Sequence, residues 1–286
     1  MPHSIKNWIV ETAWLDEHLS APDLVVFDAS WHLPTDNRDA KAEYLAGHIP
    51  GALFFDIDDL CDDKSSLPHM LPSPVKFASR MKKMGVGNGM RIVCYDTQGL
   101  YSAARAWWMF RVMGINDVAV LNGGFPKWKA EGREVEDMPP VKRSERHFIP
   151  HQNSELLRDI DDMRANLQKP VAQVVDARSP GRFNGTEPEP RSGLRGGHIP
   201  GSVNVHYATL LNADGTLKPK AELEAIFRAA GIEWNRPVVT TCGSGVTASI
   251  VSLALAVLGQ TNAAVYDGSW AEWGQENGLP VATAAK

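Results

Sequence analysis

The pentapeptide Gly-His-Ile-Pro-Gly occupies residues 47–51 and occurs again, unchanged, at residues 197–201, 150 positions further along the chain. Three more landmarks recur in the same order: Val-Phe-Asp-Ala at 26–29 with Val-Asp-Ala at 175–177, the run at 91–95 with that at 237–241, and Asn-Gly-Gly-Phe at 122–125 with Asp-Gly-Ser-Trp at 267–270. Their spacing drifts only from 150 to 145 residues. Ordered landmarks at a nearly constant spacing indicate two copies of one domain, and the period is too long for a solenoid.

The composition is that of a globular chain. Its 286 residues correspond to about two domains of roughly 150 residues each. Hydrophobic residues make up 43% of the chain and charged residues 22%, which is sufficient for well-packed cores. The net charge of −5 argues against a nucleic-acid-binding or membrane-surface protein, because both classes usually present a basic face. No apolar run is long enough to predict a transmembrane helix.

The cysteine content and the N-terminus predict a cytoplasmic protein. The three cysteines are far apart in the sequence and form no Cys-x-x-Cys pair. An odd, low count argues against a disulfide framework and against a zinc site, so we expect no metal. Residues 1–10 lack the apolar segment of a secretory signal.

Each copy alternates short β-rich runs with helical patterns. In the second copy we expect strands at 171–175, 237–241 and 263–266, and helices at 222–230 and 247–258. Strands separated by helices predict an α/β fold, with a parallel sheet flanked by helices in each copy. The Pro-rich, charged segment at 136–153 is predicted to be a linker between domains 1–135 and 154–286.

A duplicated domain provides an internal control, because features common to both halves are expected to serve the fold. We therefore assign a structural role to three pairs: His48 and His198, Asp28 and Asp176, and Trp128 and Trp273. Features found in only one half are better candidates for chemistry.

The clearest difference between the halves follows the second strand pair. The second half has Cys-Gly-Ser-Gly-Val-Thr-Ala at 242–248, where the first half has Asp-Thr-Gln-Gly-Leu-Tyr-Ser at 96–102, so Cys242 corresponds to Asp96. Cys242 is predicted at the carboxyl end of a parallel strand, in a turn that opens a helix. Loop N–H groups and a helix N-terminus stabilise an anion such as a thiolate, so we expect Cys242 to be a nucleophile. Cys94 is predicted in a core strand, and Cys61 in a loop.

Two reactions use a cysteine loop of this shape. Phosphate-ester hydrolysis requires a loop closed by an arginine, but position 248 is Ala248 and the loop contains no Arg or Lys. Sulfur transfer through a cysteine persulfide suits a short neutral loop. The sequence therefore favours sulfur transfer.

The chain resembles the tandem-domain sulfurtransferases of the rhodanese superfamily from about Trp8 to Val281. The matching motifs, beyond the repeated pentapeptide, lie at 54–58, 68–72, 181–191 and 266–270. The loop at 242–248 is similar to that of the members that use 3-mercaptopyruvate, whereas members that use thiosulfate carry two cationic residues directly after the cysteine. The resemblance implies two rhodanese-like domains, with the nucleophile Cys242 only in the second.

The resemblance also implies the site residues. The implied catalytic set is Cys242, Ser244, Asp58 and His69, with the last two approaching the loop from the first domain. The implied substrate-binding residues are Arg182, Arg191, Gly243, Gly245, Val246 and Thr247. The two arginines lie in a segment with no counterpart of similar composition in the first half, and a guanidinium is the natural partner of a keto acid's carboxylate.

The expected activity is transfer of sulfur from 3-mercaptopyruvate, through a Cys242 persulfide, to an acceptor such as thioredoxin, a low-molecular thiol or cyanide, with release of pyruvate. No organic cofactor is implied. Two alternatives stay open: a thiosulfate sulfurtransferase, and a non-enzymatic sulfide carrier or regulatory module on the same fold.

Overall fold

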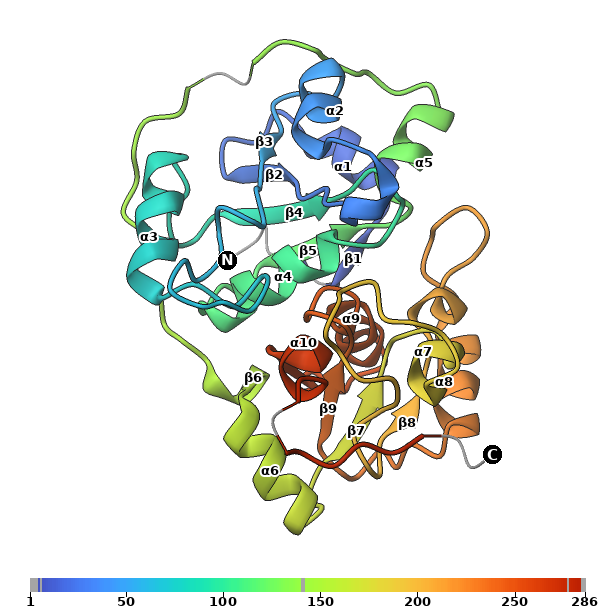
Figure 1. The fold of residues 1–286 in the computed structure, drawn as a ribbon. Coiled ribbons are helices and arrows are strands. Elements are labelled where there is room, and N and C mark those ends of the chain that lie inside the picture. The colour runs from blue at the N-terminus through green and yellow to red at the C-terminus, as the bar shows by residue number, and fades with distance from the viewer. Residues whose placement is uncertain (1–4, 6, 140–141, 277, 284–286) are drawn as a thin grey trace. The chain divides into compact units, whose positions relative to one another are not determined.

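The computed structural model describes residues 5, 7–139, 142–276 and 278–283 (Figure 1). The chain divides into two compact units. The first comprises residues 1–62, 71–153 and 212–217, and the second comprises residues 63–70, 154–211 and 218–286. Each half of the chain therefore contributes one short segment to the unit built mainly from the other half.

The first unit contains a parallel five-stranded sheet in the order β1-β5-β4-β2-β3. Its strands are β1 (Ile9–Val10), β2 (Leu24–Asp28), β3 (Leu53–Phe54), β4 (Arg91–Tyr95) and β5 (Val118–Leu121). Its helices are α1 (Thr12–His18), α2 (Ala40–Ala46), α3 (Pro74–Lys83), α4 (Ala103–Val112) and α5 (Gly124–Ala130), with a 3₁₀ turn at Pro34–Asp36.

The second unit repeats this plan, with a parallel sheet in the order β6-β10-β9-β7-β8. Its strands are β6 (Leu157–Arg158), β7 (Gln173–Asp176), β8 (Val203–Asn204), β9 (Val238–Thr241) and β10 (Ala264–Tyr266). Its helices are α6 (Ile160–Gln168), α7 (Pro180–Asn184), α8 (Lys220–Ala229), α9 (Ala248–Val257) and α10 (Ser269–Trp273), with 3₁₀ turns at Ser154–Leu156 and Tyr207–Leu210.

The two sheets have the same strand order, so the predicted duplication and the α/β class are confirmed. The strands and helices predicted in the second half are present, with ends that differ by one or two residues. In each sheet the strand order reverses between two central strands, β4 and β2 in one unit and β9 and β7 in the other. Open α/β sheets bind ligands outside the carboxyl ends of such strands.

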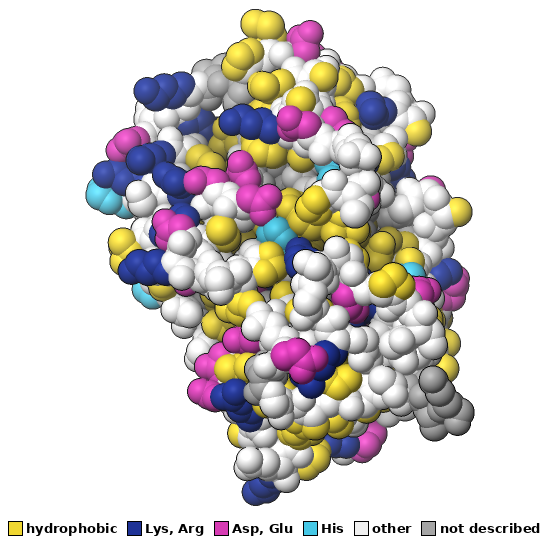
Figure 2. Space-filling view, in the orientation of Figure 1, with side chains coloured by type: hydrophobic (Ala, Val, Ile, Leu, Met, Phe, Trp, Pro, Cys, Tyr) yellow, Lys and Arg dark blue, Asp and Glu magenta, His cyan; other side chains and the backbone are white. Residues whose placement is uncertain are grey.

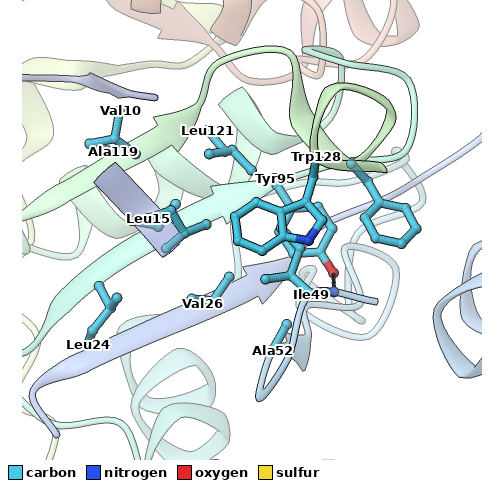
Figure 3. Close-up of a cluster of buried hydrophobic side chains, with 12 residues drawn as sticks. Val10, Leu15, Leu24, Val26, Ile49, Ala52, Tyr95, Ala119, Leu121 and Trp128 are labelled. Carbon is cyan, nitrogen blue, oxygen red and sulfur yellow. Dashed lines mark hydrogen bonds between the residues drawn. The ribbon is translucent and has the colours of Figure 1, made fainter. Parts of the chain in front are cut away.

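The core of the first unit shows what the repeated tryptophans, Trp128 and Trp273, do in the fold. Trp128, Tyr95 and Ile49 pack together with aliphatic side chains from β2 and β5 (Figure 3). The Tyr95 hydroxyl accepts the Ile49 N–H at 3.2 Å, the dashed line in Figure 3. Trp128 and its counterpart Trp273 are both fully buried, and each indole Nε1–H donates to a chain carbonyl. This pair serves the fold, as predicted.

The histidines of the repeated pentapeptide are also structural. The Nδ1–H of His48 donates to the Tyr44 carbonyl at 2.8 Å, and the imidazole stacks on the Tyr44 ring. The Nδ1–H of His198 donates to the Phe183 carbonyl at 2.8 Å, and the imidazole stacks on the Phe183 ring. Each histidine thus fastens its pentapeptide turn to the preceding helix.

The segment that connects the halves packs along the first unit. Asn88 Nδ2 donates to the Ile149 carbonyl, and the Ile149 N–H donates to Asn88 Oδ1. Gly114 has φ +92°, and a Cβ there would lie 2.6 Å from the His151 carbonyl oxygen. The close approach of the two backbones therefore requires glycine at this position.

Charged side chains of both signs are interspersed over the face drawn in Figure 2. Among the described residues, no helix combines the length and the hydropathy that a bilayer span requires.

Candidate active site

The candidate nucleophile lies at the carboxyl end of a central strand. Cys242 directly follows β9, and the turn that it begins leads into α9 at Ala248. The thiol is nearly buried, with 2% of the residue exposed. The turn needs a left-handed residue, which Gly245 provides with φ +78°. The strand, turn and helix predicted around Cys242 are all present.

The start of α10 holds the backbone of this loop. The N–H groups of Trp270 and Ala271 donate to the carbonyl oxygens of Cys242 and Gly243, each at 2.9 Å. The Cys242 N–H donates to the Ser269 hydroxyl oxygen at 3.2 Å. With the Cys242 and Gly243 carbonyls bonded to α10, the loop around the thiol has a defined orientation.

The equivalent loop of the first unit shows which way its N–H groups point. The Asp96 carboxylate accepts the N–H groups of Gln98, Tyr101 and Ala103 at 2.7–2.9 Å. Burial raises the pKa of Asp96, and these hydrogen bonds oppose that rise. The turn is again closed by a glycine of positive φ, Gly99. A loop of this design directs backbone donors at the side chain of its first residue, which suits an anion there.

Two guanidinium groups lie close to Gly243, the residue after Cys242. A Cβ placed on Gly243 would lie 3.1 Å from Arg182 Nη2 and 3.7 Å from Arg191 Nη1. Arg182 is in α7, a single helical turn whose N-cap Ser179 accepts the Arg182 N–H and whose end is marked by Gly185 at φ +75°. This segment is helical because suitable capping residues stand at both of its ends.

Arg191 connects the loop to His69. Its Nη2 lies 3.4 Å from both Ser244 Oγ and His69 Nε2. His69 is in the segment 63–70, which belongs to the second unit although it comes from the first half of the sequence. The residue is nearly buried and has φ +61°, an unusual conformation for a residue other than glycine. Three predicted site residues are thus brought together.

Asp58, the remaining member of the implied catalytic set, belongs to the first unit. Its Oδ2 accepts the Trp31 indole N–H at 3.1 Å, and its own N–H donates to Asp56 Oδ1 at 3.1 Å. The carboxylate therefore has a fixed local setting, and its approach to the Cys242 loop stays a prediction. Val246 and Thr247 complete the loop, with Thr247 as the N-cap residue of α9.

Three residues behind Arg182 were not identified by the sequence reasoning as part of the site. Asp176, Arg178 and Glu189 form a buried chain of ion pairs that ends at Arg182. Burial alone would lower the pKa of Arg178, but the two carboxylates raise it. Glu189 lies in the Pro-Glu-Pro-Arg motif at 188–191, and its position between two prolines gave no indication of its ionic partners.

The other two cysteines have different settings from Cys242. Cys94 lies in β4, is fully buried, and has a thiol pKa raised by that burial. Cys61 is partly exposed, and its thiol donates to the Asp58 carbonyl at 2.8 Å. All three cysteines are free thiols. Within the described ranges, no three His, Cys, Asp or Glu side chains are grouped so as to hold a metal ion.

Comparisons with known proteins agree with this architecture. A model of the rhodanese-like domain matches residues 11–131 and again residues 159–276. The chain is 43% identical over 276 residues to the 3-mercaptopyruvate sulfurtransferase of Escherichia coli K12, covering 96% of this chain and 98% of that protein. It is 41% identical over 297 residues to the mitochondrial thiosulfate/3-mercaptopyruvate sulfurtransferase 1 of Arabidopsis thaliana, covering 96% of this chain and 77% of that protein.

The fold is likewise similar to a solved structure. The crystal structure of SseA, a 3-mercaptopyruvate sulfotransferase from Escherichia coli, superposes with a TM-score of 0.85 at 41% identity, over 93% of this chain and 100% of that chain. The chain therefore belongs to the rhodanese-like family, carries one such domain in each half, and is a sulfurtransferase.

Proposed function

We propose that the protein takes sulfur from 3-mercaptopyruvate and carries it as a persulfide on Cys242. The observation that supports this most directly is the pair of guanidinium groups, those of Arg182 and Arg191, that lie close to the residue after the thiol. A planar keto carboxylate bound by these groups would present its thiol sulfur to the sulfur of Cys242. Arginine is suited to this task, because its planar fork matches a carboxylate.

In the first half-reaction, the Cys242 thiolate attacks the donor sulfur and the donor's carbon–sulfur bond breaks. The electron pair of that bond goes to carbon, which leaves as the enolate of pyruvate and then takes up a proton. The outer sulfur stays on Cys242 as a persulfide. Backbone N–H groups directed at the first side chain of the loop, as around Asp96, would stabilise both the thiolate and the persulfide anion.

A proton donor is needed at the carbon that leaves. Ser244 and His69 are the candidates, since both lie 3.4 Å from the same Arg191 nitrogen. Asp58 completes the proposed relay from the first half of the chain. Each of these side chains can accept and release a proton, which general acid–base catalysis requires.

In the second half-reaction, an acceptor nucleophile, a thiolate or cyanide, attacks the outer sulfur of the persulfide, and Cys242 leaves as a thiolate. We propose thioredoxin, a low-molecular thiol or cyanide as acceptor. We also propose the cytoplasm as the compartment, because a low, odd number of cysteines suits a reducing environment.

Thiosulfate is the second candidate donor, because the Arabidopsis relative carries both donors in its name. The neutral turn at 243–245 argues for mercaptopyruvate. The cations beside this turn are the planar forks of Arg182 and Arg191, which match a carboxylate, whereas thiosulfate is a compact dianion.

The test is incubation with 3-mercaptopyruvate in the absence of an acceptor. We expect release of pyruvate and a mass gain of one sulfur on the peptide that contains Cys242. Cys242→Ser should abolish both, whereas Cys61→Ser should leave turnover largely intact. Sulfur appearing on another residue, or turnover by Cys242→Ser, would contradict the assignment of the nucleophile.

A further inference from the structure

A line of alternating charges runs behind the donor site in the second unit. It begins at Asp176, at the end of β7, and continues through Arg178 and Glu189 to Arg182. The first three side chains are 1%, 0% and 2% exposed, whereas that of Arg182 is 22% exposed. Only the last member of the line is therefore accessible to a small molecule.

Glu189 forms an ion pair with one edge of the Arg182 guanidinium. Its Oε2 accepts Arg182 Nη2 at 2.6 Å and Nε at 3.2 Å. The same Nη2 lies 3.1 Å from the position that a Cβ on Gly243 would occupy. Glu189 thus holds Arg182 against the loop and leaves the Nη1 side of the guanidinium for another anion.

Glu189 is itself held by Arg178. Arg178 Nη1 donates to Glu189 Oε1 at 2.7 Å, and its Nε and Nη2 donate to the Asp176 carboxylate. The Arg178 guanidinium also lies over the ring of Trp270, whose backbone N–H donates to the Cys242 carbonyl. The position of Glu189 is therefore tied to the end of β7 and to α10, and α10 holds the backbone of the Cys242 loop.

The first half of the chain has no arginine at the position that corresponds to Arg178. Ser30 stands two residues after Asp28, where Arg178 stands two residues after Asp176. Its N–H makes the same 2.9 Å bond to the aspartate as the Arg178 N–H makes, so the backbone turn does not require the guanidinium. The arginine occurs in the half that has a nucleophile and not in the half that has Asp96.

We propose that Glu189 is a positioning residue, which holds Arg182 in the orientation that recognises the donor's carboxylate. Through Arg182 it sets the preference for a keto-acid donor. This inference rests on the proposed function, in which Arg182 binds that carboxylate. The carboxylate of the donor is remote from the reacting sulfur, so it is bound equally in the ground state and the transition state. Weaker recognition of this carboxylate should therefore raise KM and leave kcat nearly unchanged.

The test uses the intact chain and measures kcat and KM for 3-mercaptopyruvate and for thiosulfate. Glu189→Gln keeps the size of the side chain, and Glu189→Asp keeps its charge but shortens its reach. We expect both to raise the KM for mercaptopyruvate about tenfold, the scale of one charged hydrogen bond, with a much smaller effect on thiosulfate. Glu187→Gln is the matched control, because this exposed carboxylate accepts the Ser179 hydroxyl, and it should leave KM within about twofold.

If Glu189 acted only through its negative charge, Glu189→Gln would change the KM for mercaptopyruvate in the opposite direction. Removing its negative charge would then tighten the binding of an anionic donor, so Glu189→Gln would lower KM and Glu189→Asp would match the parent protein. That result would overturn the proposal. If Glu189→Gln fails to fold, Glu189→Asp still separates the two roles.

The Arg182→Ala background distinguishes this inference from the proposed function. In that background Glu189→Gln should change kcat/KM less than twofold, because the residue through which it acts is gone. An undiminished effect of Glu189→Gln there would overturn the positioning role and leave the donor proposal in place. If Arg182→Ala itself leaves the KM for mercaptopyruvate unchanged, the carboxylate recognition in the proposed function is wrong.

Discussion

At the scale of single residues, two equivalent aspartates differ in what surrounds them. Asp176 is paired with Arg178, whereas Asp28 is fully buried and accepts the Ser30 N–H. Burial raises the pKa of Asp28 to about 6, against the lowering effect of its hydrogen bonds. Because Ser30 stands in the first unit where Arg178 stands in the second, Asp28 has no guanidinium beside it within the described part of the chain and titrates in a mildly acidic range.

This difference predicts a pH dependence of stability in the first unit. Between its unfolded pKa of 3.8 and its folded pKa of about 6, Asp28 holds a proton in the folded state that the unfolded chain has released. Stability is therefore lost as the pH rises through this window, by about 2 kcal/mol between pH 4.5 and 7. Asp28→Asn should remove this loss.

The measurement is hydrogen exchange of the β4 amides at the two pH values, in the parent protein and in Asp28→Asn. The difference between the two proteins isolates Asp28 from other carboxylates, such as Glu131, whose pKa is lowered mainly by Lys127. The amides of β9 provide the internal control. An equal pH dependence in both proteins would show that Asp28 titrates in the folded state as it does in the unfolded chain.

At the scale of elements, the loop after β9 combines a neutral turn with two arginines from another segment. Gly243 has space for no side chain without displacement of Arg182, whose Nη2 lies 3.1 Å from the position of a Cβ. The loop and α7 therefore act together: the glycine lets the guanidinium approach, and the guanidinium supplies the charge that the loop lacks.

This arrangement predicts how the donor preference can be changed. Gly243→Arg with Ser244→Lys should displace Arg182 and place cations beside the thiol, so the ratio of kcat/KM for thiosulfate to that for mercaptopyruvate should rise at least about tenfold. Gly243→Ala is the control for displacement alone, and should weaken mercaptopyruvate without improving thiosulfate. An unchanged ratio in the double variant would refute the electrostatic account of donor choice.

At the scale of the whole molecule, the second half of the sequence does not contain the complete second unit. Residues 63–70 belong to that unit, and they supply His69 to the neighbourhood of Arg191. Residues 212–217 correspondingly belong to the first unit, where the Leu217 N–H donates to Asn122 Oδ1 at 2.8 Å. The two halves are duplicated in sequence, but each unit needs a piece of the other half.

The fragment 154–286 should therefore be a poor enzyme although it contains Cys242, Arg182 and Arg191. Without His69 near the loop, we expect mercaptopyruvate turnover at least about 100-fold below that of the intact chain, the scale of a lost proton-transfer group. Circular dichroism checks that the fragment is folded, and addition of the fragment 1–153 should restore pyruvate release. Full activity of the isolated fragment would show that the segment 63–70 is dispensable.

Most of the fold and the candidate nucleophile could be predicted from the sequence. Strand and helix patterns are local, so the α/β class could be predicted from periodicity and from the glycines that end the predicted helices at 222–230 and 247–258, which are Gly231 and Gly259. The duplication supplied a comparison within one chain, and the exchange of Asp96 for Cys242 at one loop position indicated where the chemistry lies. The implied pair Arg182 and Arg191 was also visible, through motifs that resemble a known family.

Contacts between distant residues could be identified only in the tertiary structure. His69 and Arg191 are separated by 122 positions, and no local pattern indicates that their nitrogens lie 3.4 Å apart. Glu189 reads as an ordinary surface carboxylate between two prolines, yet it is buried between two guanidiniums. The physical reason is that a buried charge is tolerated only where folding brings its partners to it. The partners of Glu189 come from the turn after β7 and from α7, and their position beside Glu189 is set by the folded chain.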